Sequence, residues 1–197
     1  MGMETIPRTT VFDAGSLDYD GSQIKPLWAF QTLGVQGDSI VYFTGKMSVS
    51  RDALVDLEDL REATVSVPIS SELVLHFIVE HFDDPSLRLA YHRQRILVAA
   101  AKKEVTKAAK THVERDASDL YFKGRKLSVS VATASASSAK IHLGLNITAE
   151  GVPEGVEAVG LSELGIKDVS ALATSIAKSY AREIAEIEDD LTKTRVF

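Results

Sequence analysis

The pattern of hydrophobic and polar positions changes several times along the chain, and its strongest parts predict two strands and two long helices. Residues 38–45 and 72–82 are rich in β-branched and aromatic side chains, which predicts strands. From 84 to about 110, apolar residues recur at three- and four-residue spacing and predict a helix with Arg93 on its inward stripe. A second long helix is predicted from about Asp168, a residue type that often caps helix N-termini.

Shorter elements complete the pattern. Residues 21–34 predict a short helix, and the acidic segment 52–63 predicts either a short helix or a strand-to-helix turn. Three more strands are expected, at roughly 112–115, 119–133 with a turn at Gly124, and 139–148. The order helix, strands, helix, strands, helix predicts an α+β fold in which helices flank a largely antiparallel sheet, built as one domain over residues 1–197.

The two strands that flank the small, polar segment 133–139 carry the clearest candidate ligand site. Side chains alternate between the two faces of a strand, so every second residue shares a face. Symmetric pairing about Ala136 would join six residues in one patch: Lys126, Ser128 and Ser130 on the first strand, opposite Asn146, Gly144 and His142 on the second. Gly144 favours a ligand site, because a glycine inside a strand often marks a close approach of ligand or backbone. The alternative is an ordinary solvent-facing side of the sheet.

Three further candidates lie outside this hairpin. His76 and Glu80 share a face of the strand at 72–82, where they could bind a metal or share a proton and so belong to a ligand site; a core histidine with a hydrogen-bond partner is the alternative. Arg93 cannot lose its charge, so on a buried stripe it needs a partner. That partner is either the anionic group of a ligand or a carboxylate of the chain itself: Asp56, Glu58, Asp59 or Glu80.

The acidic run Asp56, Glu58 and Asp59 could coordinate magnesium. An exposed acidic first turn of a helix, favoured by the helix dipole, is the commoner cause of such a run, so we predict no metal site.

Composition narrows the function classes. Of 197 residues, 45% are apolar and 25% charged, as in an ordinary globular protein, and the net charge of −6 lacks the electrostatic footprint of a nucleic-acid binder. The chain has no cysteine, which excludes a disulfide framework, a thiolate metal site and a cysteine nucleophile. No apolar stretch approaches the roughly 18 residues that span a bilayer. We therefore expect a soluble, cytoplasmic protein without a nucleic-acid or membrane partner.

Three segments resemble the catalytic domain of biotin and lipoate protein ligases. They occur in the family's order over about 119–185: DLYFKGRKL, KIHLGLNITAEGVP and VGLSELGIKDVSALATSIAKSYAREI. The resemblance implies the antiparallel sheet and flanking helices of the class II aminoacyl-tRNA synthetase superfamily. In the ligases a lysine after a turn glycine contacts the acyl carbonyl and the phosphate of an acyl-adenylate. The resemblance implies this catalytic role for Lys126, with Asp119 at the family's acidic position and Asn146 in the opposite strand.

Over its whole length the chain resembles a set of small prokaryotic proteins, domain-of-unknown-function family 366. The runs that carry this likeness are GVQGDSIVYFTG, VDLEDL, HFIVEHFD, RQRILV and GRKLSVSVATAS. This second resemblance implies a fold and no activity.

The chain departs from the ligases at two places. Nothing matches their glycine-rich phosphate loop, because the nearest segment, 44–60, has one glycine and several carboxylates that would repel a triphosphate without a metal ion. This counts against ATP with Mg²⁺ as a cofactor. Val129 stands where lipoate ligases have a glycine shortly after the lysine, so lipoyl or biotinyl specificity does not carry over.

Three functions remain open from the sequence. The first is a ligase-like or acyltransferase-like enzyme that binds a small carboxylic acid or its acyl-adenylate. The second is a non-catalytic binding module that has lost adenylation, and the third is a structural homodimer. In the first two the partner is a small-molecule carboxylate or a nucleotide-like ligand.

Overall fold

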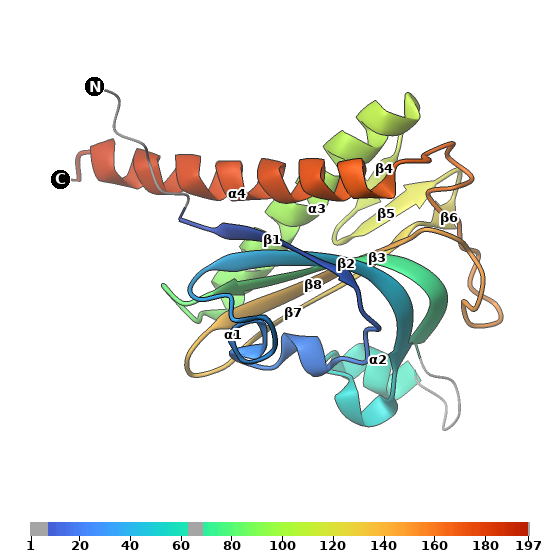
Figure 1. Ribbon diagram of the computed structural model, residues 1–197, viewed down its shortest axis with the longest axis horizontal. Coiled ribbons are helices and arrows are strands. Elements are labelled where there is room, and N and C mark those ends of the chain that lie inside the picture. Colours follow the sequence, from blue (N-terminus) through green and yellow to red (C-terminus); the bar gives the residue numbers. More distant parts are fainter. Residues whose placement is uncertain (1–7, 63–68, 197) are drawn as a thin grey trace.

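A computed structural model describes residues 8–62 and 69–196 of the chain, apart from the side chains of Glu58, Asp59 and Glu62. Its centre is a five-stranded sheet with the order β1-β2-β3-β8-β7 (Figure 1). The first two strands are parallel and the other neighbours are antiparallel. The strands of this sheet are β1 (Thr10–Ser16), β2 (Ser39–Val49), β3 (Ile69–His81), β7 (Ser128–Ala134) and β8 (Ala139–Asn146).

A second, three-stranded sheet is smaller and antiparallel. It consists of β4 (Glu114–Asp116), β5 (Asp119–Phe122) and β6 (Arg125–Lys126). The two sheets together confirm the predicted α+β class with a largely antiparallel sheet.

Helices cover the two faces of the large sheet unequally. The long helices α3 (Leu87–Ala109) and α4 (Val169–Lys193) lie on one face, and four short elements lie on the other (Figure 1). These short elements are the 3-10 helices η1 (Ser22–Ile24) and η2 (Arg51–Ala53), and the α-helices α1 (Trp28–Leu33) and α2 (Leu57–Glu62). None of the described helices is long and apolar enough to cross a membrane.

Both long helices begin at side-chain caps. Ser86 precedes α3, and its hydroxyl accepts a hydrogen bond from the Leu89 backbone N–H at 3.4 Å. Asp168 caps α4 by accepting from the Ala171 N–H at 2.9 Å, as the sequence predicts. Each cap satisfies a backbone donor that the first helical turn leaves unpaired.

The sheet separates two hydrophobic clusters. The larger cluster joins α3 and α4 to the sheet, with side chains such as Ala90, Leu97, Leu143, Ile176 and Tyr180. The smaller cluster lies under the short elements, with side chains such as Tyr19, Trp28, Phe43, Val74 and Ile78. This division defines two faces, which we call the long-helix face and the short-helix face.

A glycine in β2 permits a close crossing on the short-helix face. A Cβ at Gly45 would lie only 1.9 Å from the backbone oxygen of Leu17. Only glycine fits where another backbone passes this closely. Gly45 thereby places the segment that carries Tyr19 over the sheet.

Candidate functional site

The hairpin of β7 and β8 pairs one residue away from the predicted register. Ser128 faces Leu145 and Ser130 faces Leu143, whereas symmetric pairing about Ala136 would set them opposite Gly144 and His142. The reason is the turn, which spans residues 135–138 and closes through the Ser135 N–H to the Ser138 oxygen at 2.9 Å. An even number of turn residues cannot be symmetric about a single residue, so the predicted register is wrong.

This shift divides the predicted patch between the two faces of the sheet, because a slip of one residue moves side chains to the opposite face. The Ser130 hydroxyl accepts from Gln94 Nε2 of α3 at 2.9 Å, and the Ser128 hydroxyl accepts from the Leu120 N–H at 2.8 Å. Both serine side chains therefore lie on the long-helix face. His142 instead packs on the short-helix face, where the ring of Tyr19 stacks on it.

Lys126 lies in the small sheet and not in the hairpin. Its Nζ is 3.2 Å from Asp119 Oδ2, and the two side chains are 34% and 25% exposed. Asn146 is buried, and its backbone N–H donates to the Leu127 oxygen at 2.9 Å. Neither Lys126 nor Asn146 lines the two cavities described below. The contact between Lys126 and Asp119 was not predicted, and the predicted pairing of Lys126 with Asn146 is replaced by that of Leu127 with Asn146. The part of Lys126, Asp119 and Asn146 in binding or catalysis stays a prediction.

Side chains occupy the space beside Gly144. A Cβ at this position would lie 3.1 Å from Cγ1 of Val74 and 3.3 Å from Cγ2 of Val129. The small residue therefore accommodates neighbouring strands, and the expectation of a gap for a ligand at Gly144 is wrong.

Arg93 forms an ion pair within the chain, which was one of its two predicted alternatives. Its guanidinium donates two hydrogen bonds to Asp83, at 2.8 and 2.5 Å, although Asp83 was not among the predicted partners. These bonds lower the pKa of Asp83 to about 2. The side chains of two of the predicted partners, Glu58 and Asp59, lie outside the described residues.

A neighbouring group joins the end of β3 to α4. His81 lies 2.8 Å from Asp38 Oδ2 through Nδ1 and 2.9 Å from the Tyr180 hydroxyl through Nε2. Asp38, His81 and Asp83 offer ligand atoms within 4.8 Å of one another, which is compatible with a metal ion. Because each of these residues already has a hydrogen-bond partner within the chain, the structure accounts for this group as a connection between sheet and helices.

His76 forms a buried pair with His142 on the short-helix face. Nδ1 of His76 lies 3.0 Å from Nε2 of His142, and the Tyr19 ring stacks on His142 with a centroid distance of 3.8 Å. Burial lowers the pKa of His76 to about 4, and burial with the neighbouring His76 lowers that of His142 well below its usual range. Both imidazoles are therefore neutral at pH 7. Nε2 of His76 is buried and has no hydrogen-bond partner among the described residues.

Glu80 belongs to a different cluster, in which it pairs with Lys140. Nζ of Lys140 donates to Oε2 of Glu80 at 2.7 Å, and the two side chains are only 1% and 2% exposed. The other carboxylate oxygen accepts from the Ser138 hydroxyl at 2.7 Å and from the Leu27 N–H at 2.8 Å. Burial lowers the pKa of Lys140, and its hydrogen bond and charge interaction with Glu80 oppose that effect.

Lys140 was not among the residues predicted from the sequence. A signal for it existed, because Lys140 shares the strand alternation of His142, Gly144 and Asn146 and must lie on their face. A lysine on a strand that is buried along its whole length needs a partner or a ligand.

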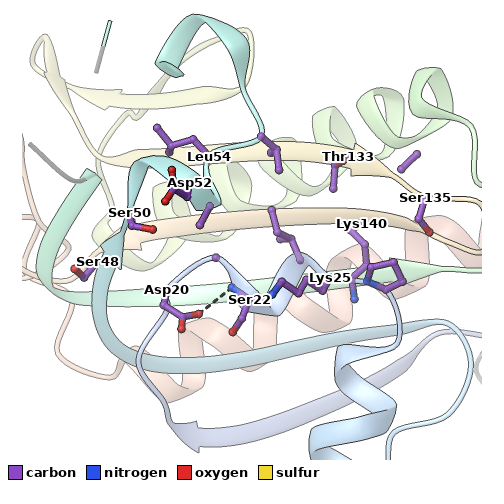
Figure 2. A pocket seen from close by; sticks show the side chains of 16 residues that line it. Asp20, Ser22, Lys25, Ser48, Ser50, Asp52, Leu54, Thr133, Ser135 and Lys140 are labelled. Atoms are coloured by element: carbon purple, nitrogen blue, oxygen red, sulfur yellow. Dashed lines mark hydrogen bonds between the residues drawn. The ribbon is translucent and has the colours of Figure 1, made fainter. Parts of the chain in front are cut away.

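A cleft of about 580 Å³ opens beside Lys140 on the short-helix face (Figure 2). It lies between η1, the segment that follows β2, and the hairpin of β7 and β8. Figure 2 shows Lys25 and Lys140 toward one side, and Asp20, Ser48 and Asp52 toward the other. The cleft thus combines a buried cation, an exposed cation, two carboxylates, hydroxyl groups and apolar side chains in one concave surface.

The sheet order, the flanking helices and the cleft over the sheet define a class of protein with the biotin protein ligase fold. The biotin protein ligase from Aquifex aeolicus in complex with biotin and ATP superposes with a TM-score of 0.65 at 14% identity, over 90% of this chain and 72% of that one. The Leishmania major enzyme in complex with biotinyl-5-AMP gives 0.58 at 13% identity, over 92% and 76%. At this identity the likeness concerns the fold alone.

Two archaeal proteins are more similar. A protein of unknown function from Pyrococcus horikoshi superposes with a TM-score of 0.89 at 38% identity, over 96% of this chain and 99% of that one. The uncharacterized protein MJ0805 from Methanocaldococcus jannaschii is 48% identical over 185 residues, which cover 93% of this chain and 83% of that protein. The chain belongs to the family Domain of unknown function (DUF366), which matches residues 9–195.

Proposed function

We propose that this protein binds a small organic acid in the 580 Å³ cleft and that Lys140 contacts the carboxylate of the acid. The observation that carries the proposal is the hydrogen bonding of the buried ammonium. A lysine ammonium has three N–H donors, and within the described residues Lys140 uses one of them, toward Glu80. An anionic oxygen in the cleft could accept from the remaining donors.

The dimensions and charges of the cleft support a small ligand. A volume of about 580 Å³ lies within the roughly 300–1,000 Å³ that is usual for ligand pockets. An ammonium away from bulk water interacts more strongly with an anion than an exposed one does, because the local dielectric is lower. Lys25 adds a second cation on the side of the cleft where Lys140 lies, whereas the carboxylates of Asp20 and Asp52 lie toward the other side. The carboxylate of an acid is therefore favoured on the side of Lys25 and Lys140.

Binding without activation by ATP agrees best with the residues that line the cleft. Lys126 and Asp119 do not line it, and the sequence lacks a glycine-rich phosphate loop. Structures of the same fold are known in complex with biotin and ATP, which supports a ligand site on this scaffold and leaves the chemistry open. We therefore favour a binding module over a ligase or acyltransferase.

Thermal unfolding with a panel of acids tests the proposal. The panel contains straight-chain acids from acetate to octanoate, biotin and lipoate, each with and without ATP and Mg²⁺. An acid at a hundredfold excess over its dissociation constant should stabilise the protein by about 2.7 kcal/mol. The stabilisation should disappear in Lys140→Met and persist in two controls, Lys126→Ala and the exposed Lys167→Met.

Lys140→Met breaks a buried ion pair, so circular dichroism is used to check that this variant is folded. Glu80→Gln/Lys140→Met is a second variant, in which no unpaired carboxylate remains. If no acid stabilises the wild-type protein, the proposal is wrong. If stabilisation requires ATP and Lys126 but not Lys140, a ligase-like enzyme replaces the binding module.

A further inference from the structure

A second, smaller cavity lies beside the cleft, within the short-helix cluster. Its volume is about 60 Å³, and the side chains of Tyr19, Met47, Val49, Val131 and His142 are part of its lining. The cleft and this cavity share four lining residues: Ile24, Ala53, Leu54 and Val55. The two spaces are therefore adjacent.

The strand β8 fixes the spacing between the two spaces. Lys140 lines the cleft and His142 lines the small cavity, and the two residues lie two positions apart on the same face of β8. A strand rises about 3.3 Å per residue, so their Cα atoms are separated by roughly 6.6 Å along β8. A molecule of a few carbon atoms spans such a distance.

The lining of the small cavity favours an apolar group. Most of the side chains around it are aliphatic or aromatic. Nε2 of His142 is already engaged with His76. A polar group placed there would lose its hydrogen bonds to water and find few replacements, which is unfavourable. A short aliphatic group has no hydrogen bonds to lose and would fill the empty space.

We propose that the small cavity receives the apolar end of the acid whose carboxylate contacts Lys140, and that this end is two or three heavy atoms in size. The inference rests on the proposed function and adds the ligand class: a short or branched carboxylic acid with a compact apolar end. The size follows from the volume, because an apolar cavity of about 150 Å³ accommodates benzene, with its six heavy atoms, and this cavity measures about 60 Å³. A bulky ring system does not fit this space.

The dependence of affinity on chain length tests the inference by calorimetry. Straight-chain acids from acetate to octanoate should bind about fourfold more tightly for each methylene that enters the cavity, until the cavity is full and the gain ends. Val131, opposite His142 in the hairpin, is the residue to vary. In Val131→Ala, the affinity should continue to rise for one or two more carbons of chain length. In Val131→Phe, the affinity should stop rising at a shorter chain length than in the wild type. Val169→Ala, a valine beside the other cluster, is the matched control and should behave as wild type.

The possible failures are distinguishable. If no acid binds the wild-type protein, the proposed function fails and the inference fails with it. If acids bind through Lys140 but both Val131 variants keep the wild-type length dependence, the inference alone is wrong, and the apolar end lies in the open cleft. Urea unfolding of each variant confirms that the two Val131 variants are folded, and the opposite shifts expected of them cannot arise from a common loss of stability.

Discussion

The buried pair of His76 and His142 should make the fold sensitive to mild acid. A histidine has a pKa near 6.5 in the unfolded chain, whereas burial lowers the pKa of His76 to about 4 in the folded protein. Between these values the unfolded state binds more protons than the folded state, so the free energy of unfolding falls as the pH falls. Protonation of His76 alone should lower the free energy of unfolding by about 2 kcal/mol from pH 7 to pH 5, and by about 3 kcal/mol in total below pH 4.

His142 changes stability in the same direction, because its pKa is lowered as well. Lowered carboxyl pKa values, such as that of Asp83, reduce stability only when the pH falls below the ordinary range of carboxyl groups near 4. The window from pH 7 to pH 5 therefore reports mainly on histidines.

Urea unfolding followed by circular dichroism at pH 7, 6 and 5 measures this effect. The double variant His76→Asn/His142→Gln should flatten the pH dependence even if it is less stable at pH 7, because the titrating groups are gone. His112→Gln, at an exposed position, is the control and should keep the wild-type slope. Equal pH slopes in the wild type and the double variant would refute the assignment of acid sensitivity to this pair.

Three further substitutions test the structure by urea or thermal unfolding. Lys140→Met should lower the free energy of unfolding by about 3 kcal/mol, because it leaves the Glu80 carboxylate buried without its cation. Glu80→Gln/Lys140→Met removes that charge, keeps an acceptor for the Ser138 hydroxyl and the Leu27 N–H, and should therefore cost less than Lys140→Met alone; a larger cost would contradict a buried pair. Gly45→Ala should lower the free energy of unfolding by about 2 kcal/mol or more, since the new Cβ would meet the Leu17 backbone oxygen. An unchanged free energy of unfolding would exclude the close crossing. Lys126→Ala should lower the free energy of unfolding by less than about 1 kcal/mol, because the ion pair of Lys126 with Asp119 is partly exposed. A larger decrease would indicate an additional buried partner.

The parts of the fold that the sequence predicted have strong local signals. The helices at 87–109 and 169–193 follow from apolar residues at three- and four-residue spacing together with good caps. The strands β2 and β3 follow from runs of β-branched and aromatic residues. The strand β1 was not predicted, because its sequence TVFDAGS has few apolar residues. This strand lies at the edge of the sheet and pairs only with β2. A half-exposed edge strand has little need for a hydrophobic pattern.

The candidate site depended on features that no local pattern determines. The parity of a short turn decided which face the serines of β7 occupy, and residues 133–139 have no sequence signal that distinguishes an odd from an even turn. The partner of Lys140 lies 60 residues earlier, at Glu80. The partner of Arg93 lies only 10 residues earlier, yet across the link between a strand and a helix. Local periodicity identified which residues need partners, and the topology selected the partners.

The polar residues of β3 and β8 are difficult to explain by stability alone. A buried ion pair such as Glu80 and Lys140 contributes little compared with well-packed apolar residues of similar size. The buried pair of His76 and His142 leaves a ring nitrogen without a hydrogen-bond partner in the described part of the chain and reduces stability in acid. Local departures from the rules of core packing are expected where a protein has a function to perform. Lys140 lines the cleft and His142 lines the cavity, so the proposed ligand binding would account for polar residues that the fold itself does not require.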